Sequence, residues 1–523
     1  MKNNFVVIGG GTAGFISALF IKCKYPEYNV TLIKDDKIGI LGAGEGTTPH
    51  MVDFLENELN ISIFQLFKNT NTTLKTGIKF TNWTKDKGSY FHGFHIHEPA
   101  AFLVNGDFFK NVVREGKNYD DYSIPYQLAN CCKSPFVENN SFVSLSRDEI
   151  NQHNINVFKS LTRNSVSFAV HFDAGELAAY LEKVAVERGI KVINDKVLEV
   201  NLDDKKYISS LDLESNGKYE VDYIIDSTGF ARLINGKTYN SEWISLSENL
   251  PMKEAQPFFL PVQDLEEVNP WTESIAQDDG WIWKIPLQHR YGCGYVYDSD
   301  YVDNDTVRAR IKQMYPDAMI GEKTFKFKAG YFNKTAINNS FAAGLSSSFV
   351  EPLEATSLYL CIDQLMYAYR NGLFQSFISS DNSEQDINLQ QMICNRVNEY
   401  CRESNQDTAE FIQFHYISDR DDTKFWKEFR QKNILFDRTM AKVHMLNNGI
   451  TDTHQVSCFP LIFGQPSYCQ VGVGLNMLKV SHDVSPLNSY HLDNIKISID
   501  EFVKKHLTHS EVINSAEWKY PSS

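Results

Sequence analysis

The chain reads FVVIGGGTAGFISALFIK over residues 5–22, and this stretch decides the fold. The apolar run 5–8 predicts a buried parallel strand, and the run 15–22 after the glycines predicts a helix. A second apolar run, VTLI at residues 30–33, predicts the next strand. A strand, a glycine turn, a helix and a strand within about 30 residues are the context that a dinucleotide-binding G-x-G-x-x-G string requires.

Each glycine of the string has a physical role in that motif. Gly9 permits the tight turn, Gly11 lets the backbone approach a pyrophosphate, and Gly14 lets the helix pack closely on the strand. The pyrophosphate would lie at the helix N-terminus, where free N–H groups and the helix dipole favour negative charge. The contacts expected from this turn are Gly9, Gly11, Thr12, Ala13 and Gly14.

An acidic residue at the end of the second strand usually binds the ribose. Lys34 occupies the nearest position and Asp35 follows it, so we expect Asp35 to make this contact. Glycine-containing segments also occur far downstream, with DSTGF at residues 226–230 and AAGLS at residues 342–346. A site that needs such distant loops favours FAD over a nicotinamide cofactor. Further FAD contacts are expected at Val197, Asp226, Gly344 and Leu345.

The rest of the pattern indicates an α/β protein. We predict a helix at 175–188, strands at 191–193, 197–202, 206–211 and 221–226, further strands to about 332, and mainly helices from 354 to 447. The fold expected is a Rossmann-type FAD-binding module with mixed sheets and a largely helical C-terminal region. The FAD-binding module would comprise residues 1–105 and 160–355, and the substrate-binding region residues 106–159 and 356–523.

Composition excludes several classes of partner. The 523 residues carry 51 basic and 66 acidic side chains, for a net charge of −15, which argues against nucleic acid and acidic membrane surfaces. The nine cysteines show no metal-ligand spacing, so no metal is expected and the thiols suit a cytoplasmic protein. Three consecutive glycines interrupt the apolar stretch 5–21, so we do not expect it to be a signal or a membrane span.

Several motifs resemble those of the flavin-dependent halogenases, the group that contains the tryptophan halogenases, from residue 6 to about 426. GWIWKIP at residues 280–286 resembles the family's G-W-x-W-x-I-P signature, and FVEPLE at 349–354 matches another family stretch. GAGEGTTP at residues 42–49 is similar to the family's G-V-G-E-A-T-x-P loop near the flavin. The resemblance implies flavin contacts at Gly44 and Glu45, and a passage lined by Trp281, Trp283 and Pro286.

The same resemblance implies the catalytic residues. The family's essential lysine precedes a string that here reads KTGIKFTNW at 75–83, which gives Lys75, and its essential glutamate corresponds to Glu354. In one continuous strand Lys79 would share a face with Lys75, so the pattern of the residues alone leaves both open. The halide-binding amides correspond to Thr356 and Ser357, where Ala355 replaces the usual Ser and Ser357 the usual Gly.

The implied reaction uses FADH₂ from a separate flavin reductase, with O₂ and halide ion, to make hypohalous acid. Lys75 would receive this oxidant by hydrogen bonding or as a haloamine, and both roles stay open. Glu354 would orient the electrophile and remove the ring proton.

His92 and Phe94 match an aromatic pair that sandwiches the substrate ring in tryptophan halogenases. The C-terminal region lacks the paired tyrosines and the glutamate that clamp free tryptophan, and it offers Phe459, Phe463 and Tyr468 instead. We therefore expect an indole, a phenol or another small electron-rich arene. The alternatives are an FAD-dependent aromatic hydroxylase and a flavin-binding protein without turnover, and a homo-oligomer stays open.

Overall fold

The computed structural model describes residues 4–39, 44–94, 96, 100–137, 166–379, 383–432, 434–457, 459, 461–480 and 491–514. Residues 42 and 43 of the flavin loop, and much of the expected substrate segment 106–159, lie outside these ranges. None of the helices in the described ranges is both long and apolar enough to cross a membrane.

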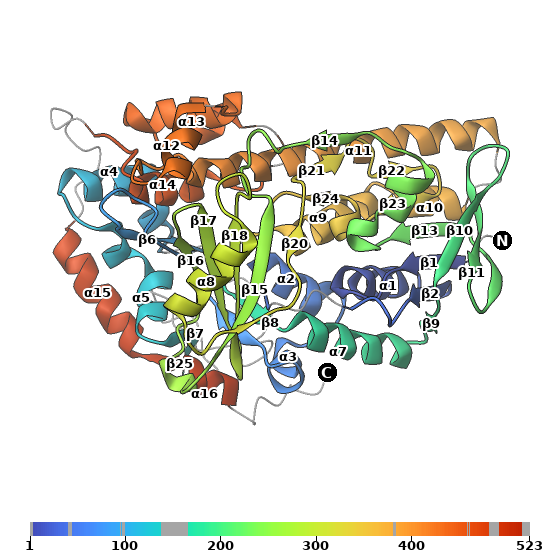
Figure 1. Ribbon diagram of the computed structural model, residues 1–523, viewed down its shortest axis with the longest axis horizontal. Helices are drawn as coiled ribbons and strands as arrows, with labels where there is room; N and C mark the ends of the chain where they lie inside the picture. The colour runs from blue at the N-terminus through green and yellow to red at the C-terminus, as the bar shows by residue number, and fades with distance from the viewer. Residues whose placement is uncertain are drawn as a thin grey trace, which may run out of the picture.

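A six-stranded sheet contains the strands predicted around the glycine turn (Figure 1). Its order is β22 (Ala336–Ile337), β23 (Ser340–Ala342), β13 (Tyr223–Asp226), β1 (Asn4–Ile8), β2 (Asn29–Lys34) and β9 (Lys191–Asn194). All neighbours are parallel except β22 and β23. The predicted parallel sheet is thus confirmed.

The two faces of this sheet are covered differently. Phe5 and Val7 of β1 pack against helices that include α1 (Thr12–Lys24) and α7 (Ala174–Glu187). Val6 and Ile8 face a three-stranded antiparallel sheet made of β10 (Val197–Leu202), β11 (Ile208–Leu213) and β12 (Gly217–Glu220). Burial on both faces explains why β1 is apolar at every position from 5 to 8.

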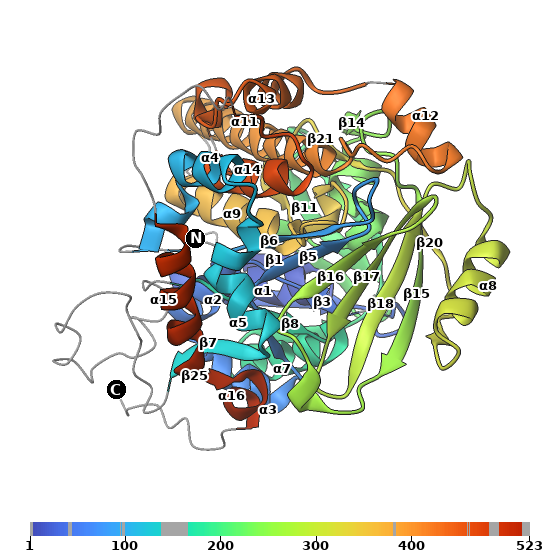
Figure 2. The same ribbon diagram turned by 90° about the vertical axis from the view of Figure 1, so that its left-hand side faces the viewer.

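A larger, mostly antiparallel sheet stands beside the first (Figures 1 and 2). Its central strands are β15 (Glu254–Pro261), β18 (Arg290–Tyr297), β17 (Gly280–Pro286), β16 (Thr272–Ala276), β5 (Gly77–Thr81) and β6 (Ser89–Gly93). Only the pair of β16 and β5 is parallel among these neighbours. The GWIWKIP segment forms β17, in the middle of this sheet.

A small third sheet joins segments far apart in the sequence. Its order is β3 (Glu45–Gly46), β8 (Ala169–Phe172) and β4 (Thr73–Lys75), all antiparallel. It places the flavin loop and the strand that carries Lys75 on opposite sides of β8.

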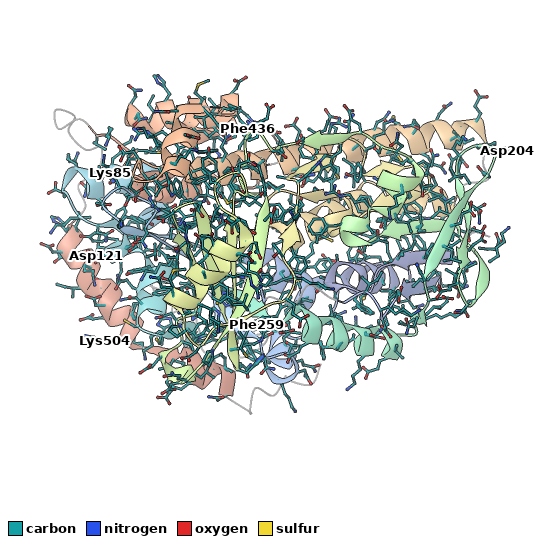
Figure 3. All side chains as sticks on the ribbon, in the orientation of Figure 1. Lys85, Asp121, Asp204, Phe259, Phe436 and Lys504 are labelled. Carbon is teal, nitrogen blue, oxygen red and sulfur yellow. The ribbon has the colours of Figure 1, made fainter. Side chains whose placement is uncertain are left out.

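Helices cover the upper side of both large sheets in Figure 1. The longest, α11 (Glu384–His415), packs on α9 (Ser357–Arg370) and α13 (Asp437–Asn447). Farther along the chain, α14 (Gln465–Gly474) packs on β6 and on α4 (Gly106–Arg114), and α15 (Leu492–Lys504) on α5 (Ile124–Asn130). Side chains fill the space between these layers (Figure 3). The mixed sheets and the helices that dominate the chain after residue 357 confirm the predicted α/β fold with a mainly helical C-terminal region.

Candidate active site

The glycine turn after β1 leaves free space at the start of α1. A Cβ atom on Gly14 would lie 1.9 Å from the Gly9 carbonyl oxygen, and one on Gly9 would lie 2.2 Å from the Ser227 carbonyl oxygen. A Cβ on Gly11, in contrast, would meet nothing within 4 Å. Gly11 caps α1 through its backbone alone, and the buried Thr12 begins the helix. Open space at a helix N-terminus is suited to a pyrophosphate group.

The distant glycine segment reaches the same helix terminus. Gly344 has a φ of +65°, and a Cβ there would lie only 2.8 Å from the Cβ of Ala13. The Ala343 N–H donates to the Asp226 carbonyl oxygen over 2.8 Å, and Leu345 is half-buried next to this contact. The structure therefore brings the three predicted flavin segments together.

The Asp226 carboxylate serves the loop that follows it. One oxygen accepts from the Thr228 N–H at 2.9 Å and its hydroxyl at 2.7 Å, and the other accepts from the Ile234 N–H at 2.7 Å. Asp226 is fully buried, and these hydrogen bonds fix the loop that follows it. The neighbouring Ser227 hydroxyl is buried without a hydrogen-bond partner among the described residues, as expected where a cofactor group would bind.

The expected ribose site lies at the end of β2. Lys34, at the position usually acidic, forms an ion pair with Glu182 at 2.7 Å. Asp35 is half-buried beyond it. The Asp195 N–H donates to the Lys34 carbonyl oxygen over 2.7 Å, which brings the half-buried Val197 to the same strand end. Asp35 and Val197 thus lie at one edge of the sheet, as a shared adenosine site requires.

The flavin loop borders the large sheet. Gly44 has a φ of +80°, and a Cβ there would lie 3.5 Å from the Ile285 side chain, next to Pro286 at the end of β17. Burial, with a smaller contribution from Asp173, raises the pKa of Glu45 to about 7.

The two tryptophans of β17 pack against each other and against residues of neighbouring elements. The Trp281 indole N–H lies 2.9 Å from the Tyr416 hydroxyl and 3.2 Å from Glu351 Oε1, and donates to both. The Trp283 ring covers Gly294, where a Cβ would lie 2.1 Å from the ring, and packs edge-on against Trp281 at 6.3 Å. Burial raises the pKa of Glu351 to about 8 despite its bonds to Tyr416 and Trp281, so this acid is protonated at neutral pH.

Lys75 is fully buried at the end of β4. Its Nζ donates to the Thr47 carbonyl oxygen over 2.9 Å and lies 5.4 Å from the centre of the Phe94 ring. Burial lowers the pKa of Lys75 to about 8, and the nearby Glu354 charge partly opposes this shift. The amine is therefore held inside the protein with a pKa close to neutral pH.

Lys79 lies elsewhere, and the expectation that it shares a face with Lys75 is wrong. The chain changes partners at Thr76, so that β4 pairs with β8 whereas β5 pairs with β6 and β16. Lys79 is half-buried with its Nζ 4.6 Å from the centre of the Trp271 ring.

Two histidines flank the buried Glu354 carboxylate. The His92 Nδ1 atom lies 3.0 Å from each carboxylate oxygen, and His415 Nε2 lies 2.8 Å from Oε1. Burial alone would raise the pKa of Glu354, but His92 and His415 lower it to about 2. His415 is itself fixed, because its Nδ1 lies 2.9 Å from the Tyr90 hydroxyl and its ring stacks on Phe80 at 4.5 Å. The sequence does not reveal this pairing of His415 with Glu354.

Further aromatic rings pack around His92. The His92 ring lies 5.2 Å from Phe411 and 6.2 Å from Phe463, and Phe411 and Phe463 stack at 3.9 Å. Tyr468 packs edge-on against Phe411 at 5.0 Å, and its hydroxyl accepts from Lys442 over 2.9 Å. His92, Phe411, Phe463 and Tyr468, which we call the aromatic cluster, thus meet beside Glu354.

The structure does not bring Phe459 to the aromatic cluster. Phe459 is 78% exposed, and its ring lies 6.0 Å from that of Tyr400. Phe463 is instead fixed by Asp407, whose Oδ2 accepts from the N–H groups of Ile462 at 2.9 Å and Phe463 at 3.3 Å.

The expected halide-binding amides lie at the start of α9. Thr356 is the N-cap residue and Ser357 the first helical residue, and no side chain caps this end. Ala355 has a φ of +55°, which turns the chain between Glu354 and the helix. Free N–H groups at a helix N-terminus favour an anion.

Comparison with known proteins agrees with this geometry. The family model described as tryptophan halogenase matches residues 4–488. The tryptophan 6-halogenase SttH of Streptomyces toxytricini is 27% identical over 493 residues, covering 92% of this chain and 90% of that protein. The tryptophan 7-halogenase RebH of Lentzea aerocolonigenes is 27% identical over 470 residues, covering 86% and 82%.

A solved structure gives the same result. Tar14, a tryptophan C-6 flavin-dependent halogenase from taromycin biosynthesis, matches with a TM-score of 0.83 at 25% identity, over 98% of this chain and 99% of that chain. Because the family model spans nearly the whole chain, the protein belongs to the tryptophan halogenase family and is an enzyme that halogenates an aromatic substrate with the help of a flavin.

Proposed function

We propose that this enzyme uses FADH₂, O₂ and halide ion to make hypohalous acid, which Lys75 delivers to an electron-rich arene of the indole or phenol type. The observation that carries the proposal is the full burial of the Lys75 amine, close enough to the Glu354 carboxylate for the two charges to interact. Burying a charged lysine costs folding free energy, so a fully buried lysine is a candidate functional residue.

The start of α1 and the loops beside it fit FAD. The pyrophosphate region would be held by residues at the start of α1 and in the loop that reaches it, namely Gly9, Gly11, Thr12, Ala13, Gly14, Gly344 and Leu345. Asp35 and Val197 would hold the adenosine. Gly44 and Glu45 would face the flavin. Asp226 would shape the loop. When bound and reduced, FAD would activate O₂, and O₂ is the oxidant that converts halide to hypohalous acid. A separate flavin reductase would provide the reduced form. The amides of Thr356 and Ser357 would hold the halide.

Trp281, Trp283 and Pro286 would line the way from the flavin to Lys75. Bulky rings held by hydrogen bonds and packing would exclude an arene from the flavin. This keeps the arene at Lys75 and away from direct oxygenation. The FAD-binding part would then lie in residues 1–105 and 160–355, and the arene-binding part in 106–159 and 356–523.

Lys75 and Glu354 would divide the final step. The arene attacks the halogen of hypohalous acid, the carbon–halogen bond forms, and the halogen–oxygen bond breaks. The Lys75 ammonium donates a proton to the departing oxygen, which leaves as water, and Lys75 regains a proton when the ring proton passes on from Glu354. Glu354, ionised because two histidines lower its pKa, removes the ring proton. One arene and one hypohalous acid give one haloarene and one water.

The arene would bind between Phe94 and the aromatic cluster. The Phe94 ring lies 5.4 Å from Lys75 Nζ, and the Phe463 ring lies 6.2 Å from the His92 ring. Offset stacking and edge contacts of this kind suit a small planar ring. Tyr468 supports Phe411, and Phe459 takes no part.

The test is mass spectrometry of an arene panel incubated with the enzyme, FAD, a flavin reductase, NADH and each halide in turn. We expect products that gain halogen and lose hydrogen, only when halide is present. Products that gain oxygen without halide would show an aromatic hydroxylase. Absence of any product across the panel would show a flavin-binding protein without turnover.

A further inference from the structure

Asp407 fixes a segment without regular structure at the aromatic cluster. Residues 461–464 precede α14, and the half-buried Phe463 of this segment stacks on Phe411. The N–H groups of Ile462 and Phe463 donate to Asp407 Oδ2 over 2.9 Å and 3.3 Å, and within the described ranges they bond to no other acceptor. The place of this segment therefore depends on one carboxylate.

The helix α11 links this carboxylate to the candidate active site. Asp407, Phe411 and His415 follow one another at four-residue intervals, so they lie on one face of α11, about 6 Å apart along its axis. His415 lies at the Glu354 end of this row, whereas Asp407 lies at the other end. Because Phe463 stacks on Phe411 at 3.9 Å and lies 6.2 Å from the His92 ring, holding Phe463 shapes the cluster itself.

The surroundings of Asp407 make it a strong acceptor. Asp407 is 2% exposed and burial raises its pKa, but the Lys442 charge and the N–H groups of Ile462 and Phe463 oppose this shift. Lys442 is fully buried and in turn donates to the Tyr468 hydroxyl over 2.9 Å. Hydrogen bonds to a charged acceptor are stronger than those to a neutral one. The carboxylate thus suits the task of fixing two backbone groups.

We propose that Asp407 is a positioning residue that determines which arenes the enzyme accepts, because it holds Phe463 on Phe411 beside His92. Phe463 then forms a wall of the arene site, and its fixed position limits the size of the ring that fits. Asp407 acts through Phe463 and not on the reacting atoms. The inference rests on the proposed function, since it takes the aromatic cluster as part of the arene site.

The first test compares indole with the larger arene carbazole. Asp407→Ala removes the acceptor, and Asp407→Asn keeps an acceptor oxygen without the charge. The ratio of kcat/KM for the two arenes is measured with FAD, a flavin reductase, NADH and bromide. We expect Asp407→Ala to lower the preference for indole about tenfold, the effect of losing a hydrogen bond to a charged group. The change should come from KM, with kcat nearly unchanged, and Asp407→Asn should keep most of the preference.

The second test asks whether Asp407 acts through Phe463. Phe463→Leu reduces the wall without removing a buried charge, so this variant folds independently of the fate of Asp407→Ala. It should lower the preference for indole to a similar extent, and Asp407→Ala added to it should change the preference little further. The matched control is Phe459→Leu, which alters an exposed ring four residues earlier and should leave the preference unchanged.

The third test measures the segment itself in the flavin-free protein. Hydrogen exchange reports whether the Ile462 and Phe463 N–H groups are held. We expect these two groups to exchange at least about tenfold faster in Asp407→Ala, and near the wild-type rate in Asp407→Asn. The amides of α7, which lies under the other sheet, should exchange as in wild type.

The outcomes distinguish the positioning role from the proposed function. An unchanged preference in Asp407→Ala, additive effects in the double variant, or unchanged exchange at Ile462 and Phe463 would overturn the role of Asp407 while the halogenase function stands. Faster exchange that includes α7 would also overturn it, because Asp407 would then support the whole fold. A wild-type enzyme that halogenates no arene would overturn the proposed function and with it this inference.

Discussion

Lys75 and Lys79 are four residues apart and have unrelated surroundings. Lys75 is buried beside the Phe94 ring and close to the Glu354 charge, whereas Lys79 is half-buried on Trp271. We predict that Lys75→Met abolishes arene halogenation because no amine remains to receive the oxidant, while flavin oxidation continues. Lys79→Met, the matched control, should keep product formation. Product mass spectrometry together with NADH consumption checks both, and retained product in Lys75→Met would contradict the assignment.

Glu354 is a buried base that stays charged. We predict that Glu354→Gln lowers turnover by about 10²-fold, the range for a positioned acid–base group, because the amide cannot take the ring proton. The matched control is Asp120→Asn, since Asp120 is also buried, with a pKa raised by burial to about 7, but interacts with the Phe91 backbone and the Lys79 charge instead of with the two histidines. Steady-state rates at saturating bromide measure the effect. Equal losses in the two variants would point to a general effect of removing a buried acid.

At the scale of elements, two glycines of the turn between β1 and α1 have different roles, one in packing and the other in cofactor binding. A Cβ at Gly14 would strike the Gly9 carbonyl, whereas a Cβ at Gly11 would meet nothing. We predict that Gly14→Ala lowers the thermal midpoint clearly, and that Gly11→Ala leaves it unchanged but weakens FAD binding about tenfold or more. Thermal unfolding without FAD and fluorescence titration with FAD distinguish the two. Normal FAD affinity in Gly11→Ala would remove the pyrophosphate from this turn.

At the scale of the whole molecule, local signals in the sequence predict much of the fold but only part of the site. The run 5–8, the glycine turn and the helix 15–22 are local patterns, and β1, α1 and β2 confirm them within a few residues. The motif also singles out Lys75, which the structure buries. The meeting of His92, Glu354 and His415 could not be read, since it depends on contacts between residues hundreds of positions apart.

The break between β4 and β5 was equally hidden. Residues 73–81 look like one strand because β propensity does not report which neighbours a strand pairs with. The partners come from β8, β6 and β16, which lie on both sides of the segment in the sequence. The ring of His509, the first residue of α16 (His509–Asn514), accepts from the Leu74 N–H of β4 over 3.0 Å, and no pattern near residue 74 indicates this contact.

Burial of the charged Lys75 amine destabilises the folded protein. The pH dependence of the free energy of unfolding can measure this cost. The pKa of Lys75 falls from 10.5 to about 8, a shift that costs the folded state about 3 kcal/mol while the amine is charged. Between pH 8 and pH 10.5 the unfolded chain binds more protons at this site than the folded protein, so this site makes stability rise with pH across that window.

We therefore predict that Lys75→Met is more stable than wild type at pH 7, and that its advantage shrinks toward pH 10.5. All other titrating groups are common to both proteins and largely cancel in the difference. Urea unfolding of wild type, Lys75→Met and the control Lys79→Met at pH 7 and pH 10.5 gives the comparison. A difference between Lys75→Met and wild type that is the same at both pH values would mean that the folded protein does not hold Lys75 with a lowered pKa.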